Sequence, residues 1–484
     1  MSTKQISQHW SSRMYCDKPD RVSQFEDAYQ SDCSRLIYSP SFRRLQGKTQ
    51  LYPNGEYDYF RSRLTHSLEV NEIAQCICTS INQKIGQKGL ETKFSVCSDV
   101  VRFACLAHDL GHPPFGHDGE EALNKCMEKY DGFDGNAQTF RILTRIEKGG
   151  VSSYSLMADR GYGERVGLNI TYRSLASVLK HVDKDSNPEK PAARGFYPSE
   201  AGIVEEVFTA LGCPRPGLRT IECQIMDISD DISNAVHDLD DSLKSGLLNP
   251  FDLFFPQEDI LEKVARNVFN REEHYYDLNM EAKAEDFKKI YCQLNRIFED
   301  FVDTNFPISR GSDILSAVSP FYKKLRQLSS DGAQRSSFIN SLKNRLISSV
   351  NLISCDEDNP LFWEIGFDSI GHDDNLDDPG LQIQILKLFH RYYQCDSTFI
   401  EYRKYRGIHI VTQLFDAIKE KTSLMPDDYR SLFESLKSQN NKTDRNMDQY
   451  RCICDYIAGM TDRYCLELYG RLFSETPQSI FKPI

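Results

Sequence analysis

Helical hydrophobic periodicity is the feature that most constrains the fold of this 484-residue chain. Apolar residues recur at three- and four-residue spacing, which is the period of amphipathic helices, and strand-like alternation is scarce. The pattern covers residues 67–126, 138–146, 172–179, 203–211, 221–243 and 285–302, and it continues intermittently to 473. The sequence therefore predicts a nearly all-α protein.

Clusters of glycine and proline interrupt the helical pattern, and we predict that they form loops within one globular unit. They lie at Gly111–Gly116, Gly149–Gly150, Asp185–Tyr197 and Cys213–Gly217. The chain has no internal repeat, no Gly/Ser-rich tether and no low-complexity tract. Although its length allows about three domains of ordinary size, we expect one continuous globular unit.

Composition excludes several classes of protein. Asp and Glu total 71 against 58 Lys and Arg, and the net charge of −13 opposes a general affinity for phosphate backbones. No apolar run is long enough to span a bilayer, and Met1–Arg13 contains no apolar stretch like that of a signal peptide. We expect a cytoplasmic protein that has no membrane partner.

The 15 cysteines are scattered, odd in number and never spaced CxxC. This pattern disfavours both a disulfide framework and a cysteine zinc site, so we expect reduced, mostly buried thiols. A second compositional feature is the acidic segment 356–378, which lies in a stretch without Lys or Arg between Arg345 and Lys387. We interpret it as a solvated loop, with a regulatory or partner surface as the alternative.

Three of the 11 histidines lie within ten residues, at His108, His112 and His117. His108 and Asp109 end a predicted helix and together offer an imidazole and a carboxylate, which are common ligands of divalent cations. If the helix continues, His112 shares a face with His108. Pro113-Pro114 should then end the helix and hold His117 in a turn.

Two further segments supply similar groups. His66 stands at the start of a predicted helix, with Thr65 as the expected N-cap. Residues 222–241 form a predicted helix with carboxylates on several faces. Each piece alone is weak, because an isolated His-Asp pair is usually a surface accident and a histidine before a helix is usually a cap or a core residue.

Taken in order, the motifs are very specific. The chain strongly resembles the HD-domain phosphohydrolases, and within them the deoxyguanosine triphosphate triphosphohydrolase (dGTPase) family. The blocks that carry the resemblance are residues 41–50 (SFRRLQGKTQ), 63–70 (RLTHSLEV), 108–117 (HDLGHPPFGH), 135–138 (GNAQ), 167–171 (GLNIT) and 455–464 (DYIAGMTDRY).

This resemblance implies an all-α HD core within residues 1–240 and a helical elaboration, 241–484, that completes the pocket and makes oligomer contacts. It also implies one divalent metal per subunit, Mn²⁺ or Mg²⁺, bound by His66, His108, Asp109 and Asp230. Asp230 is chosen over Asp227 and Asp231 because the family has a second acidic residue eight positions later, which is Asp238 here. Asp231, Asp240 and Asp241 are interpreted as solvated helix surface.

The reaction implied is hydrolysis of a dNTP, with dGTP the leading substrate, to a deoxynucleoside and triphosphate. Residues carried over from the family are Arg63, His112, Lys180 and Asn136 for phosphate, His117 with Glu120 as the catalytic pair, and Gln46 with Asp238 for the sugar 3′ hydroxyl. Whether His117 acts as acid or base stays open. Asn234 stands where relatives have a tyrosine beneath the sugar, so we expect weak discrimination against ribose.

Partners also follow from the resemblance. Family members are commonly hexamers, so we expect a homo-oligomer in which Arg463 reaches the triphosphate of its own or a neighbouring subunit. Arg43, Arg44 and Lys48 form a basic patch for a nucleotide or single-stranded DNA effector, or a structural cluster.

Two other functions compete with the dGTPase interpretation. An HD nucleotidase or cyclic-nucleotide phosphodiesterase is disfavoured because such chains lack the blocks at 135–138 and 455–464. A non-catalytic nucleotide sensor or DNA-binding regulator is disfavoured by the intact set of site residues and by the acidic charge. Whether depletion of dNTPs serves nucleotide-pool control or defence against phage stays open.

Overall fold

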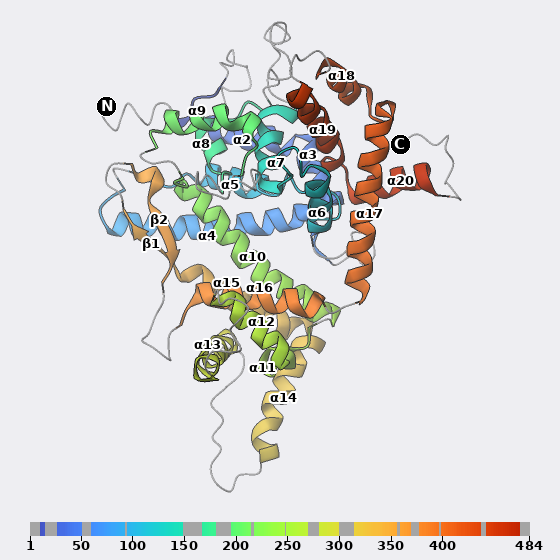
Figure 1. Ribbon diagram of the computed structural model, residues 1–484. Coiled ribbons are helices and arrows are strands. Elements are labelled where there is room, and N and C mark those ends of the chain that lie inside the picture. The colour runs from blue at the N-terminus through green and yellow to red at the C-terminus, as the bar shows by residue number, and fades with distance from the viewer. Residues whose placement is uncertain are drawn as a thin grey trace.

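The prediction of a nearly all-α fold is confirmed by the computed structural model of the chain (Figure 1). The structure describes residues 10–14, 27–50, 60–91, 94–148, 167–180, 195–213, 217–246, 248–269, 280–299, 314–355, 359–368, 377–395, 398–436 and 442–474. Among these residues, strands β1 (Val350–Ser354) and β2 (Glu364–Phe367) form an antiparallel pair, and the other regular elements are helical.

The central layer consists of three helices, α4 (Arg63–Gln87), α5 (Ser98–Ala107) and α10 (Ile221–Ser245). They pack on one another through buried apolar faces, as the periodicity predicts. On α4 that face comprises Val70, Ile73, Ala74, Ile77, Ile81 and Ile85. Helices α2 (Ala28–Ile37), α8 (Tyr172–Ala176) and α9 (Ala201–Leu211) lie on the far side of α5 from α10 (Figure 1).

The start of α4 corrects one prediction, because the N-cap is Ser62 and not Thr65. The Ser62 side chain accepts the Thr65 backbone N–H, and the Thr65 hydroxyl accepts the Ser62 backbone N–H at 3.0 Å. This reciprocal capping box satisfies two donors that a helix end would otherwise leave unpaired. The helix consequently begins at Arg63, which places Arg63 and His66 together in its first turn.

The segment after α5 corrects two further predictions. Helix α5 ends at Ala107, so His112 lies in a turn and does not continue the helical face of His108. His117, expected in a turn, is the first residue of α6 (His117–Cys126). The chain reverses between them at Phe115 and Gly116, whose φ angles are 65° and 62°. The left-handed conformation of this pair is what lets a new helix begin directly at His117.

The remaining helices form two groups beside the central layer. Helices α11 (Pro250–Phe254), α12 (Glu258–Val268), α13 (Met280–Phe298), α14 (Ile314–Ser330), α15 (Gly332–Ser348) and α16 (Pro379–Cys395) gather around the carboxyl-terminal half of α10. Helices α17 (Thr398–Glu420), α18 (Asp427–Ser435), α19 (Lys442–Ala458) and α20 (Asp462–Phe473) share a second apolar core with α6. In Figure 1 this second group forms the orange and red edge of the molecule.

Several compositional predictions meet the structure only in part. The described cysteines are all free, and seven of these thirteen are buried. Gly149–Gly150, residues 185–194 and most of the acidic segment, at 356–358 and 369–376, lie outside the described residues.

Helix α10 runs through position 240 without interruption, and the division at that position stays a prediction. In the part of the chain that the structure describes, every helix is too short or too polar to cross a bilayer.

Candidate metal centre and active site

Four side chains from three elements converge where α4, α5 and α10 meet. His66 Nε2 lies 3.1 Å from Asp230 Oδ1, on α10. His108 Nε2, just after α5, lies 3.6 Å from the same oxygen and 3.5 Å from Asp109 Oδ1. Ligand atoms of His66, His108 and Asp109 all lie within 4.8 Å of one another. The structure thus brings together the four predicted metal ligands.

The donor atoms fit a divalent ion. Two ligands that each lie about 2.1 Å from one ion, at tetrahedral or octahedral angles, are roughly 3.0–3.4 Å apart, close to the separations found here. The His108 ring is also oriented for binding, because Nδ1 lies 2.7 Å from the Cys105 carbonyl oxygen and its proton can be donated there. Its Nε2 is buried and has no hydrogen-bond partner among the described residues. Burial opposes protonation of His108, but the charges of Asp109 and Asp230 raise its pKa. A divalent ion that bound here would displace the Nε2 proton, and the neutral ring would then offer its lone pair to the ion.

Electrostatics keep both carboxylates ionised. Burial alone would raise the pKa of Asp109, but the charges of Arg63 and His108 outweigh burial and hold that pKa well below its usual range. Burial likewise opposes ionisation of Asp230, whose pKa is nevertheless held low by Lys180 and His108. Carboxylates that stay anionic while buried are suited to bind a cation.

Two basic side chains and one imidazole border the cluster. Arg63 donates to Asp109 Oδ2 at 2.8 Å, and Lys180 donates to Asp230 Oδ2 at 2.9 Å. His112 Nδ1 lies 3.0 Å from Asp109 Oδ1. Burial and the neighbouring Arg63 lower the pKa of His112, which favours the neutral ring. Three of the four predicted phosphate-binding residues therefore contact the carboxylates of the cluster.

His117 and Glu120 form a pair on the first turn of α6. His117 Nδ1 lies 3.3 Å from Glu120 Oε2, and the His117 side chain is 84% exposed. Glu120 Oε1 accepts the Gly135 backbone N–H at 2.7 Å. Burial would raise the pKa of Glu120, but the bonds from His117 and from the Gly135 N–H lower it to about 2. An anionic carboxylate fixed on one side can orient the mobile imidazole on the other.

Two buried residues that sequence reasoning did not assign to the site hold the turn from His108 to His117. The Lys48 amine donates to the backbone oxygens of His112 and of Ala458, the latter at 3.0 Å. Asp462 accepts the backbone N–H of Phe115 at 3.0 Å and both the N–H and the hydroxyl of Thr49. Lys48 is only 2% exposed, so of the two interpretations of the group Arg43, Arg44 and Lys48, an effector patch or a structural cluster, the buried contacts of Lys48 fit the structural one.

A second missed group supports His66 from behind. The Ser233 hydroxyl lies 3.4 Å from His66 Nδ1 and 2.9 Å from His237 Nδ1. His237 Nδ1 is 3.1 Å from Glu69, which pairs with Arg61 at 2.8 Å. Such outer contacts fix the orientation of a ligating imidazole. The helical spacings of three residues at 66–69 and of four residues at 233–237 are a signal that could have suggested this network.

The same network corrects the interpretation of Asp240 and Asp241 as solvated helix surface. Both are buried, because Arg61 pairs with both and Arg335 donates to Asp240 at 3.1 Å. Asp231 differs, since its side chain is 45% exposed and pairs with Lys387. Helical periodicity alone assigned these groups to the surface, because it carries no information about the two cations, Arg61 just before α4 and Arg335 on α15, that pair with them.

The predicted sugar and triphosphate residues are placed less uniformly. Asn234 donates to Asp230 Oδ1 at 3.0 Å, and Asp238 lies two turns beyond Asp230 on α10. Asn136 follows Gly135 in α7 (Gly135–Arg141), and Gln46 is an exposed residue of the short helix η2 (Leu45–Gly47). Arg463 is 86% exposed and pairs with Glu467 at 2.8 Å, so its contacts within one chain do not include the cluster.

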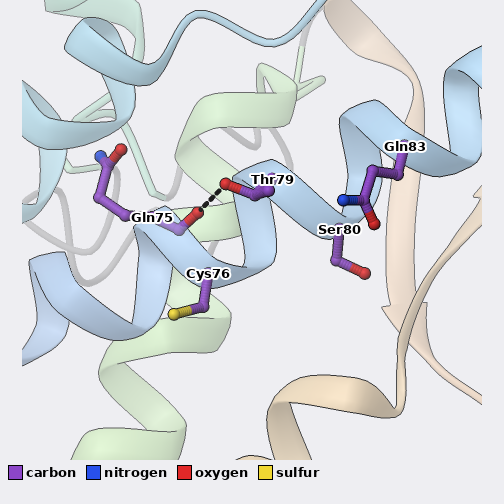
Figure 2. A pocket seen from close by; sticks show the side chains of 5 residues that line it. All are labelled: Gln75, Cys76, Thr79, Ser80 and Gln83. Carbon is purple, nitrogen blue, oxygen red and sulfur yellow. Dashed lines mark hydrogen bonds between the residues drawn. The ribbon is translucent and has the colours of Figure 1, made fainter.

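A shallow hollow on the outer side of α4 is separate from this site. It has a volume of about 400 Å³ and is lined by Gln75, Cys76, Thr79, Ser80 and Gln83 (Figure 2). The Thr79 hydroxyl donates to the Gln75 carbonyl oxygen at 2.9 Å, so these two polar groups are paired with each other within the lining. The lining has no histidine, carboxylate or cation, so we assign it no chemistry.

Comparison with known proteins agrees with this geometry. The HD domain matches residues 63–235, which run from Arg63 to just beyond Asp230. The chain is 34% identical over 491 residues to deoxyguanosinetriphosphate triphosphohydrolase-like protein 2 of Mesorhizobium japonicum, with 97% of each chain covered. The chain belongs to this family. A deoxyguanosinetriphosphate triphosphohydrolase-like protein of Cereibacter sphaeroides is 31% identical, with 94% of this chain and 95% of the relative covered.

A third relative, the deoxyguanosinetriphosphate triphosphohydrolase-like protein of Shewanella pealeana, is 28% identical, with 97% of each chain covered. Membership in the dGTPase-like family makes the chain an HD-domain phosphohydrolase. A phosphohydrolase-associated domain also matches residues 378–471, which contain α16–α20 and therefore Asp462. The two matched regions meet at the turn that carries His112 and His117.

Proposed function

We propose that this protein hydrolyses a deoxynucleoside triphosphate, with dGTP the leading substrate, to a deoxynucleoside and inorganic triphosphate. The observation that carries the proposal is the convergence of His66, His108, Asp109 and Asp230 beside two buried cations. The names of the relatives supply the substrate class.

The four-residue cluster fits one divalent ion, Mn²⁺ or Mg²⁺, because its carboxylates are anionic and His108 Nε2 is buried without a partner among the described residues. A bound ion of this kind would polarise phosphate oxygens and lower the pKa of a coordinated water. The chain itself supplies the remaining chemistry.

Arg63 and Lys180 bring positive charge to the edge of the cluster, where the triphosphate binds. His112 donates from a neutral ring, and Asn136 adds an amide next to the Gly135 that fixes Glu120. Because both cations are already paired with the metal-site carboxylates, their positions are set before substrate arrives, which lowers the ordering cost of binding.

His117 is the acid–base group of the proposal. Its exposed ring can reach the departing 5′ oxygen or the attacking water, while Glu120 holds Nδ1 and sets the proton on one ring nitrogen. Gln46 and Asp238 recognise the 3′ hydroxyl. Asn234 occupies the position of the aromatic that would exclude ribose.

The assembly and location complete the proposal. We propose a cytoplasmic homo-oligomer, a hexamer, in which the exposed Arg463 serves the triphosphate of a neighbouring subunit. A nucleotide or single-stranded DNA is the candidate effector, at a surface that includes Arg43 and Arg44. The biological outcome is either nucleotide-pool control or depletion of dNTPs against phage.

The test is an anion-exchange assay of dGTP, dATP, dCTP, dTTP and GTP with Mg²⁺ or Mn²⁺. We expect triphosphate and deoxyguanosine from dGTP, with no diphosphate product. Release of orthophosphate or pyrophosphate would assign a different phosphohydrolase activity. Nucleotide binding without any product would favour the sensor alternative.

A further inference from the structure

Helix α16 brings a buried histidine against Asp238. We propose that His390 is a positioning residue for recognition of the sugar 3′ hydroxyl, and that it acts by holding the Asp238 carboxylate. This inference rests on the proposed function, because it takes Asp238 as the acceptor of that hydroxyl.

The two ring nitrogens of His390 differ in their surroundings. His390 is 8% exposed, and its Nδ1 lies 2.7 Å from the Ser242 hydroxyl of α10. Its Nε2 is buried and has no hydrogen-bond partner among the described residues. The nearest acidic oxygen recorded for it is Asp238 Oδ2, at 3.9 Å. This distance exceeds that of an ordinary hydrogen bond by about 1 Å, which is within the reach of small side-chain rotations.

Ser242 can pair with the tautomer that the proposal needs. Burial lowers the pKa of His390 to about 4, so the ring is neutral and carries one N–H. When the Ser242 hydroxyl donates to Nδ1, the proton lies on Nε2, which faces Asp238. A buried N–H without an acceptor is unfavourable, so the arrangement favours closure onto the carboxylate.

Within the part of the chain that the structure describes, no donor lies within hydrogen-bond distance of the Asp238 carboxylate. Burial and the nearby Asp241 raise its pKa to about 8. The neighbouring cations bind other groups, since Lys387 pairs with Asp231 at 2.6 Å and Arg61 pairs with Glu69, Asp240 and Asp241. A bond from His390 to Oδ2 would stabilise the ionised acceptor form and direct Oδ1 toward a substrate hydroxyl.

The proposal gives the phosphohydrolase-associated region a role in substrate selection. His390 lies within that region, at 378–471, whereas Asp238 lies on the HD helix α10. A buried acceptor that is held in place discriminates strongly against a substrate that leaves it unpaired. The 3′ hydroxyl is therefore read by two helices that are far apart in sequence.

The experiment compares dGTP with 2′,3′-dideoxyguanosine triphosphate, because the two differ only in the 3′ hydroxyl. For His390→Phe we expect kcat/KM to fall about 10-fold with dGTP and to change less than about twofold with the dideoxynucleotide, as for loss of one hydrogen bond. Asp238→Ala should show the same selectivity. The double variant should be no worse than Asp238→Ala, since His390 acts through that carboxylate.

Two variants separate positioning from packing. His390→Gln keeps an amide donor near the place of Nε2 and should recover most of the lost selectivity. Arg391→Ala changes the exposed neighbour of His390 on α16 and should leave both nucleotides within about twofold of their original kcat/KM.

Three results would overturn the inference: equal losses with both nucleotides in His390→Phe, no loss with dGTP, or multiplied losses in the double variant. If the unaltered protein releases no triphosphate, it is the proposed function that fails. Calorimetric titration with the two nucleotides then makes the same comparison through binding affinity.

Discussion

At the scale of single residues, the polar atoms of His108 and Glu120 each contact a different group. His108 uses Nδ1 for the Cys105 carbonyl and keeps Nε2 for the cluster. Glu120 uses one oxygen for the Gly135 N–H and the other for His117. Because each atom has one partner, substitutions at these residues have separable effects.

Removing His108 should remove the metal. We expect His108→Ala to lose bound Mn²⁺ and turnover together, because one of four ligand groups is deleted. Metal content after dialysis and triphosphate release are measured on the same folded sample. His409→Ala is the control, since that exposed histidine stacks on Tyr405 at 6.2 Å. Retention of both metal and activity in His108→Ala would refute the ligand assignment.

Removing His117 should leave metal binding intact. We expect His117→Ala to lower kcat by about 10²-fold or more, the usual size of an acid–base contribution, with metal content unchanged. Glu120→Gln should act in the same direction, by weakening the orientation of the ring. If only KM rises, His117 binds substrate and transfers no proton.

Asn234 gives a prediction about sugar selection. With an amide where an aromatic would pack beneath the sugar, we expect GTP to be hydrolysed within about 10³-fold of dGTP in kcat/KM. Asn234→Tyr should widen that gap. Because Asn234 also donates to Asp230, metal content is measured alongside. Complete rejection of GTP by the unaltered protein would show that another residue closes the pocket.

At the scale of elements, the sequence predicted helices well and their ends less well. Periodicity located α4, α5 and α10 because each has a continuous apolar face. It placed the cap of α4 at Thr65 instead of Ser62, since either residue type can cap and the choice depends on the Thr49–Ser62 bridge. It placed His108 and Asp109 at the end of a helix but left open whether the helix continues to His112. Close tertiary contact accompanies the break, since a Cβ on Gly111 would lie 2.1 Å from the Gly135 carbonyl oxygen.

The ion network between α4 and α10 should contribute to stability in a pH-dependent manner. Burial opposes ionisation of Glu69, but His237 and Arg61 lower its pKa to about 2. The unfolded chain, whose Glu pKa is about 4.3, therefore binds more protons than the folded chain between about pH 4.3 and 2. The stabilisation by Glu69 is present above this range and is lost as the pH falls through it.

We consequently expect Glu69→Gln to lower the thermal midpoint at pH 6, and the difference from the unaltered protein to shrink as the pH is lowered toward 4 and below. Glu72→Gln, at an exposed position of the same helix, is the matched control and should shift the midpoint little at any pH. A difference that is constant with pH would contradict the assignment of the ion pairs.

At the scale of the whole molecule, the motif block at residues 455–464 contacts residues that lie more than 300 positions earlier in the sequence. Asp455 accepts bonds from Gln138 and Arg141, and Asp462 holds Phe115 and Thr49. The sequence resemblance identified these blocks as a set, but one chain without structure offered no reason for their joint presence. Burial of Lys48 and Asp462 could not be predicted because all of their partners except the Thr49 hydroxyl are backbone groups, which carry no sequence signal.

Asp462 provides the test at this scale. We expect Asp462→Ala to destabilise the fold by about 2–3 kcal/mol, because three buried donors lose their acceptor, and to lower kcat by loosening the turn before His117. Asp427→Ala is the control, since that aspartate occupies the same first-turn position of α18 but is 87% exposed. Loss of stability without loss of kcat would limit Asp462 to a structural role.

The hydrogen bonds of Asp462 also couple the position of α20 to the turn at Phe115–Gly116. A displacement of this helix must either break the bond to the Phe115 N–H or pull the left-handed pair Phe115–Gly116 with it. That pair immediately precedes His117, so motion at the outer edge of the molecule is transmitted to the reacting imidazole over a few bonds. Exposed residues of α20, such as Leu466, are thus mechanically coupled to the active site without being part of it.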